Sequence, residues 1–252
     1  MSILDWLYPP ICIGCRKLIS LNDTQPRDMR LCSMCQSLFE PITFPICKNC
    51  GVPTEKEVDR CVSCFGKNFY FTTNRSTFVY HEIMRDLLLE LKFNQDKQIA
   101  HSLGKLWATH VSVLLQEVPS STYLVPLPLH SKKQRERGFN QAEILTHHLS
   151  ALLNIPTEQA LQRIVDTPPQ SGLHPRQRME NVSGAFTVAK NISTQGKNYI
   201  IIDDIYTTGA SLNECAKVLL DAGAANVNCM TLSIVQKSTG DMVDNNKKSR
   251  EL

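Results

Sequence analysis

The stretch YIIIDDIYTTGAS, residues 199–211, decides the fold of this chain. Four apolar residues, Tyr199 to Ile202, predict a buried strand, and two carboxylates, Asp203 and Asp204, follow at its carboxyl end. A loop that carries hydroxyls and a glycine then leads into a helix. Ligands of open α/β sheets bind at the carboxyl ends of the strands, so the stretch predicts both a sheet strand and a ligand site.

The loop has the chemistry of a phosphate cradle. Backbone amides of residues 207–211, with the N-terminus of the following helix, would hold an anion, and Gly209 lets the backbone approach it closely. Asp203 and Asp204 would repel that phosphate, but they suit ribose hydroxyls or Mg²⁺. The pattern therefore predicts a sugar phosphate. The plainer alternative is a strand–turn–helix with two solvated aspartates and a capping threonine.

Strands and helices alternate along the rest of the chain, which favours an α/β fold with a parallel sheet. Apolar spacing predicts helices in the regions 83–91, 99–115, 141–153 and 211–223, the last one closed by Gly223. Strands are expected in the regions 72–80, 122–129, 184–188 and 226–235.

Eight of the ten cysteines form four CxxC pairs near the N-terminus: Cys12/Cys15, Cys32/Cys35, Cys47/Cys50 and Cys61/Cys64. In a reducing compartment this spacing indicates structural zinc rather than disulfides. Eight thiols fill two tetrahedral sites, so we expect two Zn²⁺ ions. Sequential pairing needs only short loops and is preferred, while a nested or cross-braced pairing stays open. Cys215 and Cys229 lie in apolar patterns and are expected in the core.

Three segments are expected: a zinc module over 1–66, an α/β domain over 67–236 and a disordered polar tail over 237–252. The start of the chain does not resemble a secretory signal and no apolar run approaches the length of a membrane span, so a cytoplasmic location is expected. Residues 1–66 carry seven Lys/Arg and seven Asp/Glu. Zinc thiolates would make the module negative, which argues against a DNA clamp.

Residues 199–211 resemble the signature with which type I phosphoribosyltransferases bind phosphoribosyl pyrophosphate (PRPP). Three further stretches narrow the resemblance to the ComF family, which includes proteins of DNA uptake, natural transformation and the use of external DNA. These stretches are LDWLYPPICIGC (4–15), VPLPLHSKKQRERGFNQAEIL (125–145) and PPQSGLHPRQRMENVSGAF (168–186). The resemblance covers nearly all of residues 1–236 and implies a type I phosphoribosyltransferase core with an N-terminal double zinc ribbon.

Roles follow from the resemblance by position. Asp203 and Asp204 would meet the ribose hydroxyls or Mg²⁺. Arginine forks suit phosphate oxygens, and the resemblance assigns them to the pyrophosphate loop and to a mobile loop over 170–181. The implied 5-phosphate contacts are Thr207, Thr208, Gly209, Ala210 and Ser211; the pyrophosphate contacts are Arg135 and Arg137; the mobile-loop contacts are Arg176 and Arg178. Solvated or structural roles are the alternatives for all four arginines.

Two functions are open at this point. The chain is either a phosphoribosyltransferase with an unidentified acceptor, or a non-catalytic PRPP-binding protein that serves DNA uptake with single-stranded DNA and uptake proteins as partners. For a strand of DNA, the basic run 132–137 would supply charge and Phe139 a stacking surface, with Lys132 and Lys133 otherwise solvated. Fold resemblance alone does not choose between the two.

Overall fold

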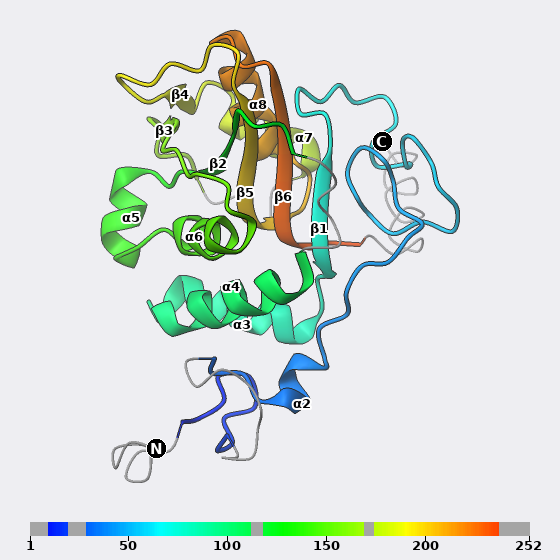
Figure 1. Cartoon of the computed structure of the whole chain (residues 1–252), viewed down its shortest axis with the longest axis vertical. Helices are drawn as coiled ribbons and strands as arrows, with labels where there is room; N and C mark the ends of the chain where they lie inside the picture. Colours follow the sequence, from blue (N-terminus) through cyan, green and yellow to red (C-terminus); the bar gives the residue numbers. More distant parts are fainter. Residues whose placement is uncertain (1–9, 20–28, 112–117, 169–173, 237–252) are drawn as a thin grey trace, which may run out of the picture.

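The computed structural model describes residues 10–19, 29–111, 118–168 and 174–236. Its centre is a four-stranded sheet in which every neighbouring pair is parallel, in the order β1-β6-β5-β2 (Figure 1). The strands are β1 (Asn74–Val79), β2 (Thr122–Pro126), β5 (Asn198–Tyr206) and β6 (Asn226–Ile234). The predicted α/β fold with a parallel sheet is confirmed.

Helices cover both faces of the sheet. Helices α3 (Glu82–Phe93), α4 (Lys97–Val111) and α6 (Gln141–Leu153) lie on one side, and α8 (Ala210–Asp221) packs on the other (Figure 1). Alternate residues of β5 feed the two cores, since Ile200 and Ile202 join the helical cluster of α3, α4 and α6 while Tyr199 and Ile201 join the cluster around α8.

Smaller elements border the sheet. Helix α5 (Ser131–Arg137) follows β2, and a two-stranded antiparallel ribbon pairs β3 (Leu161–Arg163) with β4 (Phe186–Val188). Helix α7 (Pro175–Val182) packs against α8, and α2 (Ser33–Gln36) is one turn within the cysteine-rich segment.

Most predicted elements agree with the structure, and one boundary is wrong. The helix expected over 141–153 is α6, and Gly223 follows α8 with a φ of 97° as its expected C′ residue. The strand expected to end at Ile202 continues to Tyr206, so Asp203 and Asp204 lie within β5 and not after it. Parallel pairing of β5 with β6 runs as far as Ile234, which carries the strand past the two carboxylates.

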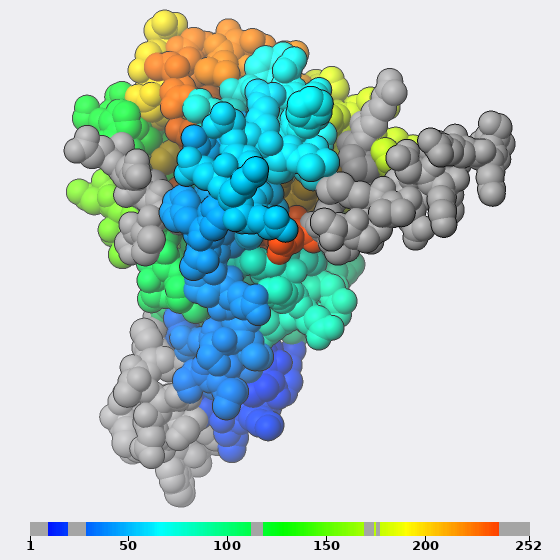
Figure 2. Space-filling model, turned by 90° about the vertical axis from the view of Figure 1, so that its right-hand side faces the viewer, coloured from blue at the N-terminus to red at the C-terminus, as the bar shows by residue number. Residues whose placement is uncertain are grey.

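The cysteine-rich segment runs along one face of the molecule, from the helical side at one end to the sheet at the other (Figure 2). Its first part shares a core with α3 and α4, and its second part shares a core with α8 and the sheet. Within the described ranges, no helix combines the length and apolar character that crossing a membrane requires. The expected tail over 237–252 lies outside the described residues, and the domain boundary near residue 66 stays a prediction.

Candidate functional site

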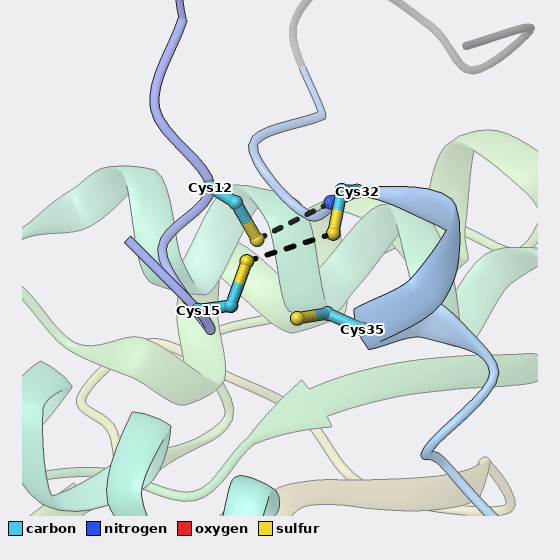
Figure 3. Close-up of side chains that lie close together, drawn as sticks. All are labelled: Cys12, Cys15, Cys32 and Cys35. Atoms are coloured by element: carbon cyan, nitrogen blue, oxygen red, sulfur yellow. Dashed lines mark hydrogen bonds between the residues drawn. The ribbon is translucent and has the colours of Figure 1, made fainter. Parts of the chain in front are cut away.

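The first two CxxC pairs converge on one point (Figure 3). The Sγ atoms of Cys15 and Cys32 lie 3.8 Å apart, and the backbone amide of Cys32 donates to Sγ of Cys12 at 3.3 Å. Burial raises the pKa of Cys12, but the amides of Cys32, Cys15 and Gly14 outweigh it and lower that pKa to about 7. A thiol poised to ionise is a ready metal ligand.

The third and fourth pairs form a second group with the same geometry. Sγ of Cys50 lies 3.7 Å from Sγ of Cys61, and the amide of Cys61 donates to Sγ of Cys47 at 3.3 Å. Gly51 turns this knuckle with a φ of 76°, and a Cβ there would lie 2.6 Å from the carbonyl oxygen of Asn74 at the start of β1. The second group is thus pressed against the sheet.

Both groups fit zinc. Four thiolates at about 2.3 Å around a tetrahedral ion lie about 3.8 Å from one another, whereas a disulfide would bring two sulfurs to about 2.05 Å. The observed sulfur separations match the first case, and the four Sγ atoms of each group lie within 4.8 Å of one another. The groups are Cys12, Cys15, Cys32, Cys35 and Cys47, Cys50, Cys61, Cys64, so the predicted sequential pairing is confirmed.

The acidic pair lies inside β5, where alternation sends the two side chains toward opposite faces. Asp204 is 2% exposed and faces the helical side, while Asp203 is half-buried. Oδ1 of Asp203 accepts the backbone N–H of Asp204 at 2.8 Å. Burial and the neighbouring Asp204 raise the pKa of Asp203 well above its ordinary value. The pair is therefore electrostatically unequal.

An ion pair with a lysine on helix α3 accounts for the difference between the two aspartates. Nζ of Lys92, in the last turn of α3, lies 3.3 Å from Oδ2 of Asp204 as an ion pair. Burial alone would raise the pKa of Asp204, but the ammonium of Lys92 and the hydrogen bond with Asp203 outweigh it, so that pKa is lowered. Asp204 in turn raises the pKa of Lys92.

The predicted phosphate loop, residues 207–211, spans the start of α8. Gly209 is the N-cap residue with a φ of 76°, and the backbone amide of Ala210 points to Oγ1 of Thr208 at 3.4 Å. A Cβ at Gly209 would lie 2.7 Å from the phenol oxygen of Tyr206. Glycine is thus required here by the backbone and by Tyr206 as well as by any ligand, which the sequence did not indicate. Thr207, Thr208 and Ser211 are half-buried around it.

Of the two arginines assigned to the pyrophosphate loop, one approaches the acidic pair. Arg137 ends α5, donates to Oε1 of Gln141, and lies in the field of both carboxylates, which oppose the lowering of its pKa by burial. Arg135 is exposed on the same helix. Arg163 on β3 stacks over Phe186 at 5.3 Å and also lies in the field of Asp203.

The expectations for the basic run need two corrections. Phe139 is 7% exposed and belongs to the helical core, so it is not a stacking surface for a strand of DNA. Gly138, in the left-handed conformation, turns the chain inward just before it. Lys133 is not simply solvated, because its Nζ donates to the carbonyl oxygen of Thr167 at 2.8 Å. Lys132 lies 3.6 Å from Asp166.

The expected mobile loop over 170–181 is only partly within the described residues, since 169–173 lie outside them. The remainder, 174–181, comprises the N-cap residue His174 and all of α7 except its last residue; the backbone N–H of His174 donates to Oε1 of Gln177 at 2.9 Å. Arg176 and Arg178 lie on this helix, and Arg178 is half-buried. Their predicted contacts with a ligand stay a prediction.

Three residues of the site were missed by the sequence reasoning: Lys92, Arg163 and Tyr206. Lys92 had a readable signal, because it continues the row formed by the buried Met84 and Leu88 at i, i+4 spacing, where a lysine needs a partner. Arg163 and Tyr206 had no such signal, because the former is placed by the β3–β4 ribbon and the latter by packing against Phe71.

Family models match both parts of the chain. Residues 3–65 match the family model of the double zinc ribbon domain, and residues 137–251 match that of the phosphoribosyl transferase domain. Among solved structures, the similar ones include adenine phosphoribosyltransferase from Saccharomyces cerevisiae, with 15% identity and a TM-score of 0.36 over 62% of this chain and 76% of that one.

Several relatives match along most of their length. Competence protein ComFC of Bacillus subtilis (strain 168) is 33% identical over 240 residues, which cover 90% of this chain and 95% of the relative. DNA utilization protein YhgH of Salmonella typhimurium is 31% identical, covering 89% of this chain and 98% of the relative. Competence protein F of Haemophilus influenzae is 27% identical, with coverages of 88% and 96%. With a double zinc ribbon ahead of a phosphoribosyltransferase-type core, the chain belongs to the ComF family.

Proposed function

We propose that the chain binds PRPP or a related ribose 5-phosphate, together with Mg²⁺, at the carboxyl end of β5, and that it acts in the cytoplasm in DNA uptake or the use of external DNA. The observation that supports this ligand is the arrangement of residues at the junction of β5 and α8. There only four residues, Ile205 to Thr208, separate the acidic pair from Gly209, the N-cap residue of α8.

Each half of this junction suits one half of a sugar phosphate. Amides at the start of α8 and the hydroxyls of Thr207, Thr208 and Ser211 would hold the 5-phosphate. Asp203, the less buried carboxylate, would accept ribose hydroxyls. Arg137 brings a guanidinium to the same end of the sheet, where a pyrophosphate needs positive charge. Carboxylates and pyrophosphate oxygens are the hard ligands that Mg²⁺ prefers, and the bound ion would neutralise pyrophosphate.

The biological role rests on the relatives, which are named competence and DNA utilization proteins. Uptake proteins and single-stranded DNA are the partners we propose on that ground. Of the basic run, Lys132 and Arg135 are exposed, although Lys132 also pairs with Asp166, whereas Lys133 is half-buried and donates to Thr167. DNA contact on this surface should therefore depend on Lys132 and Arg135 more than on Lys133.

Calorimetric titration with PRPP, Mg²⁺ and a short single strand, each alone and in combination, tests the proposal. Wild type should bind PRPP, and Asp203→Asn/Asp204→Asn should lose at least about tenfold in affinity, because it removes the negative charge that strengthens hydrogen bonds from ribose hydroxyls and attracts a metal ion. Asp221→Asn removes an exposed carboxylate at the far end of α8 and is the matched control. Equal PRPP affinity in wild type and the folded double variant would place the ligand elsewhere.

The same site also supports a second candidate, catalysed transfer of the phosphoribosyl group. Arg137 beside the acidic pair is the observation in its favour, since a departing pyrophosphate has to be stabilised by cations. Release of pyrophosphate on addition of nucleobases to protein and PRPP would support transfer. Saturable PRPP binding with no release for any base would support the binding protein alone.

A further inference from the structure

We propose that Lys92 is a built-in counter-ion for the acidic pair. Its ammonium group occupies the position at Asp204 where a divalent cation could otherwise bind, and Asp203 is then the carboxyl group that faces the ligand. The inference rests on the proposed function and deepens it. Lys92 becomes a positioning residue of the sugar-phosphate site, and Mg²⁺ is assigned to the pyrophosphate rather than to Asp204. Recognition of the ribose 5-phosphate part should then need no metal.

The lysine is placed by its helix. Met84, Leu88 and Lys92 follow one another at i, i+4 spacing, and the first two are buried against the helical core. The third position of this row reaches β5, where Nζ of Lys92 meets Oδ2 of Asp204 at 3.3 Å. The lysine side chain is 32% exposed and the aspartate side chain 3%, so a half-buried lysine pairs with a buried carboxylate.

The charges around the acidic pair act differently on the pKa values of Asp203 and Asp204. Lys92 and Arg137 both lower the pKa of Asp204, which therefore stays ionised and paired. At Asp203, burial and the negative charge of Asp204 outweigh the opposing effect of Lys92 and raise the pKa, which suits a group that exchanges hydrogen bonds with hydroxyls. Tyr80 also lies in the field of Lys92 and Asp204, and Arg163 in that of Asp203.

A buried ion pair is by itself weak support for stability, because desolvation offsets much of the attraction. Lys92 follows two buried apolar residues on α3 and lies opposite β5, the strand that leads into the predicted phosphate loop. A role in ligand binding therefore explains this lysine better than a role in stability. With Lys92 in place, the pair presents about one negative charge less to an incoming phosphate. Without Lys92, a bound metal ion would be the simplest source of the missing positive charge.

Ribose 5-phosphate separates this role from pyrophosphate binding, because it lacks the pyrophosphate that carries Mg²⁺. Wild type should bind it with the same affinity in Mg²⁺ and in Mg²⁺-free buffer, the latter made without chelators that would strip zinc. Lys92→Met should lose at least about tenfold without Mg²⁺ and recover part of that loss with it, while Lys92→Arg should stay close to wild type. Lys97→Met, at the exposed start of α4, is the control for net charge.

A second measurement needs no sugar phosphate. Mn²⁺ binding to the ligand-free, zinc-loaded protein at pH 8, followed by electron paramagnetic resonance, should be at least about tenfold tighter in Lys92→Met than in wild type. Adding Asp204→Asn to Lys92→Met should abolish the gain, and this neutral pair of substitutions guards against a failure to fold because it leaves no unpaired charge.

The outcomes are distinct. Failure of wild type to bind PRPP and ribose 5-phosphate alike contradicts the proposed function, while the Mn²⁺ measurement still decides the role of Lys92. Tight Mn²⁺ binding by wild type at Asp204, or unchanged Mn²⁺ binding in Lys92→Met, overturns the counter-ion. So does ribose 5-phosphate binding that depends on Mg²⁺ in wild type as strongly as in Lys92→Met.

Discussion

The two zinc groups have the same ligands and the same geometry, but they sit in different parts of the fold. The first group, Cys12 to Cys35, packs on the helical core of α3 and α4, and its Cys15 is exposed. The second group, Cys47 to Cys64, is more buried and packs on the sheet and α8. One module therefore packs against the fold on two sides of the proposed ligand site, through different residues.

The second group reaches the phosphate loop through Tyr206. This tyrosine is buried, lies edge-to-face with Phe71 at 6.4 Å, and closes the space beneath Gly209. Burial raises the pKa of Tyr206, and so do the thiols of Cys50 and Cys64, which places the phenol between the zinc group and the loop. The floor of the phosphate loop is thus shared with the second zinc group.

The first group contacts α4 and α3, and of these two helices α3 carries a residue of the acidic site. The backbone N–H of Arg30 donates to Oγ of Ser102 on α4 at 3.0 Å, and Arg16 forms an ion pair with Glu90 of α3. Two residues after Glu90, the same helix carries Lys92. Loss of the first group should therefore loosen the placement of Lys92 and leave the phosphate loop standing.

The largest expected effect comes from a comparison of two single variants, each of which removes one cysteine ligand from one of the two groups. Cys50→Ser should lower the free energy of unfolding by more than about 3 kcal/mol and abolish PRPP binding, because the metal site and the floor of the loop are lost together. Cys15→Ser should cost roughly half as much and leave binding of inorganic phosphate measurable. Chemical denaturation and phosphate titration of both variants measure the difference.

Metal content is the control for this pair. Each variant should retain about one of two zinc equivalents, since each loses one group. Equal losses of stability and of phosphate affinity in the two variants would show that the groups are interchangeable supports, against the comparison drawn from their packing.

An intermediate effect is expected from Tyr206→Ala, which keeps both zinc groups. Removal of a buried aromatic side chain typically costs about 3 kcal/mol or more, and here it also leaves Gly209 without support. Phosphate affinity should fall while zinc content stays at about two equivalents. Tyr70→Ala, at a tyrosine 47% exposed near the same segment, is the matched control and should stay within about 0.5 kcal/mol of wild type. Unchanged phosphate affinity in Tyr206→Ala would remove the link between the second group and the loop.

Contiguous signals of the site were predictable from the sequence, and those that depend on tertiary packing were not. The acidic pair and the loop after it lie in one short stretch, and the cysteines lie in four CxxC pairs, so these residues were found from the sequence, although the acidic pair was expected after the strand and lies within β5. Phe139 was misjudged because a basic run precedes it, while the turn at Gly138 that buries it is a matter of backbone conformation. Tyr206 needed knowledge that a distant zinc group packs beneath β5.

The smallest expected effect is a difference between the helical side and the sheet in how their stability depends on pH. His148 on α6 faces α4, where its Nε2 lies 3.2 Å from Nδ1 of His101 and a Cβ at Gly104 would meet its ring at 2.4 Å. Burial first, then the charges of His101, Lys105 and His147, lower the pKa of His148 to about 4. Its ordinary pKa is about 6.5, so between these values the unfolded chain binds the extra proton.

The helical side should accordingly lose stability as the pH falls from about 6.5 toward 4, and solvent screening at the half-buried His148 keeps the loss to about 1 kcal/mol. His148→Gln should flatten this part of the pH profile relative to wild type, whereas proton-driven loss of zinc affects both proteins alike and cancels in the difference. Hydrogen exchange should show amides of α4 opening before those of β5 in wild type at acid pH. If α4 and β5 open together, or if His148→Gln keeps the full slope, the helical and sheet sides respond to acid as one unit, and the division that the two zinc groups suggest does not extend to stability.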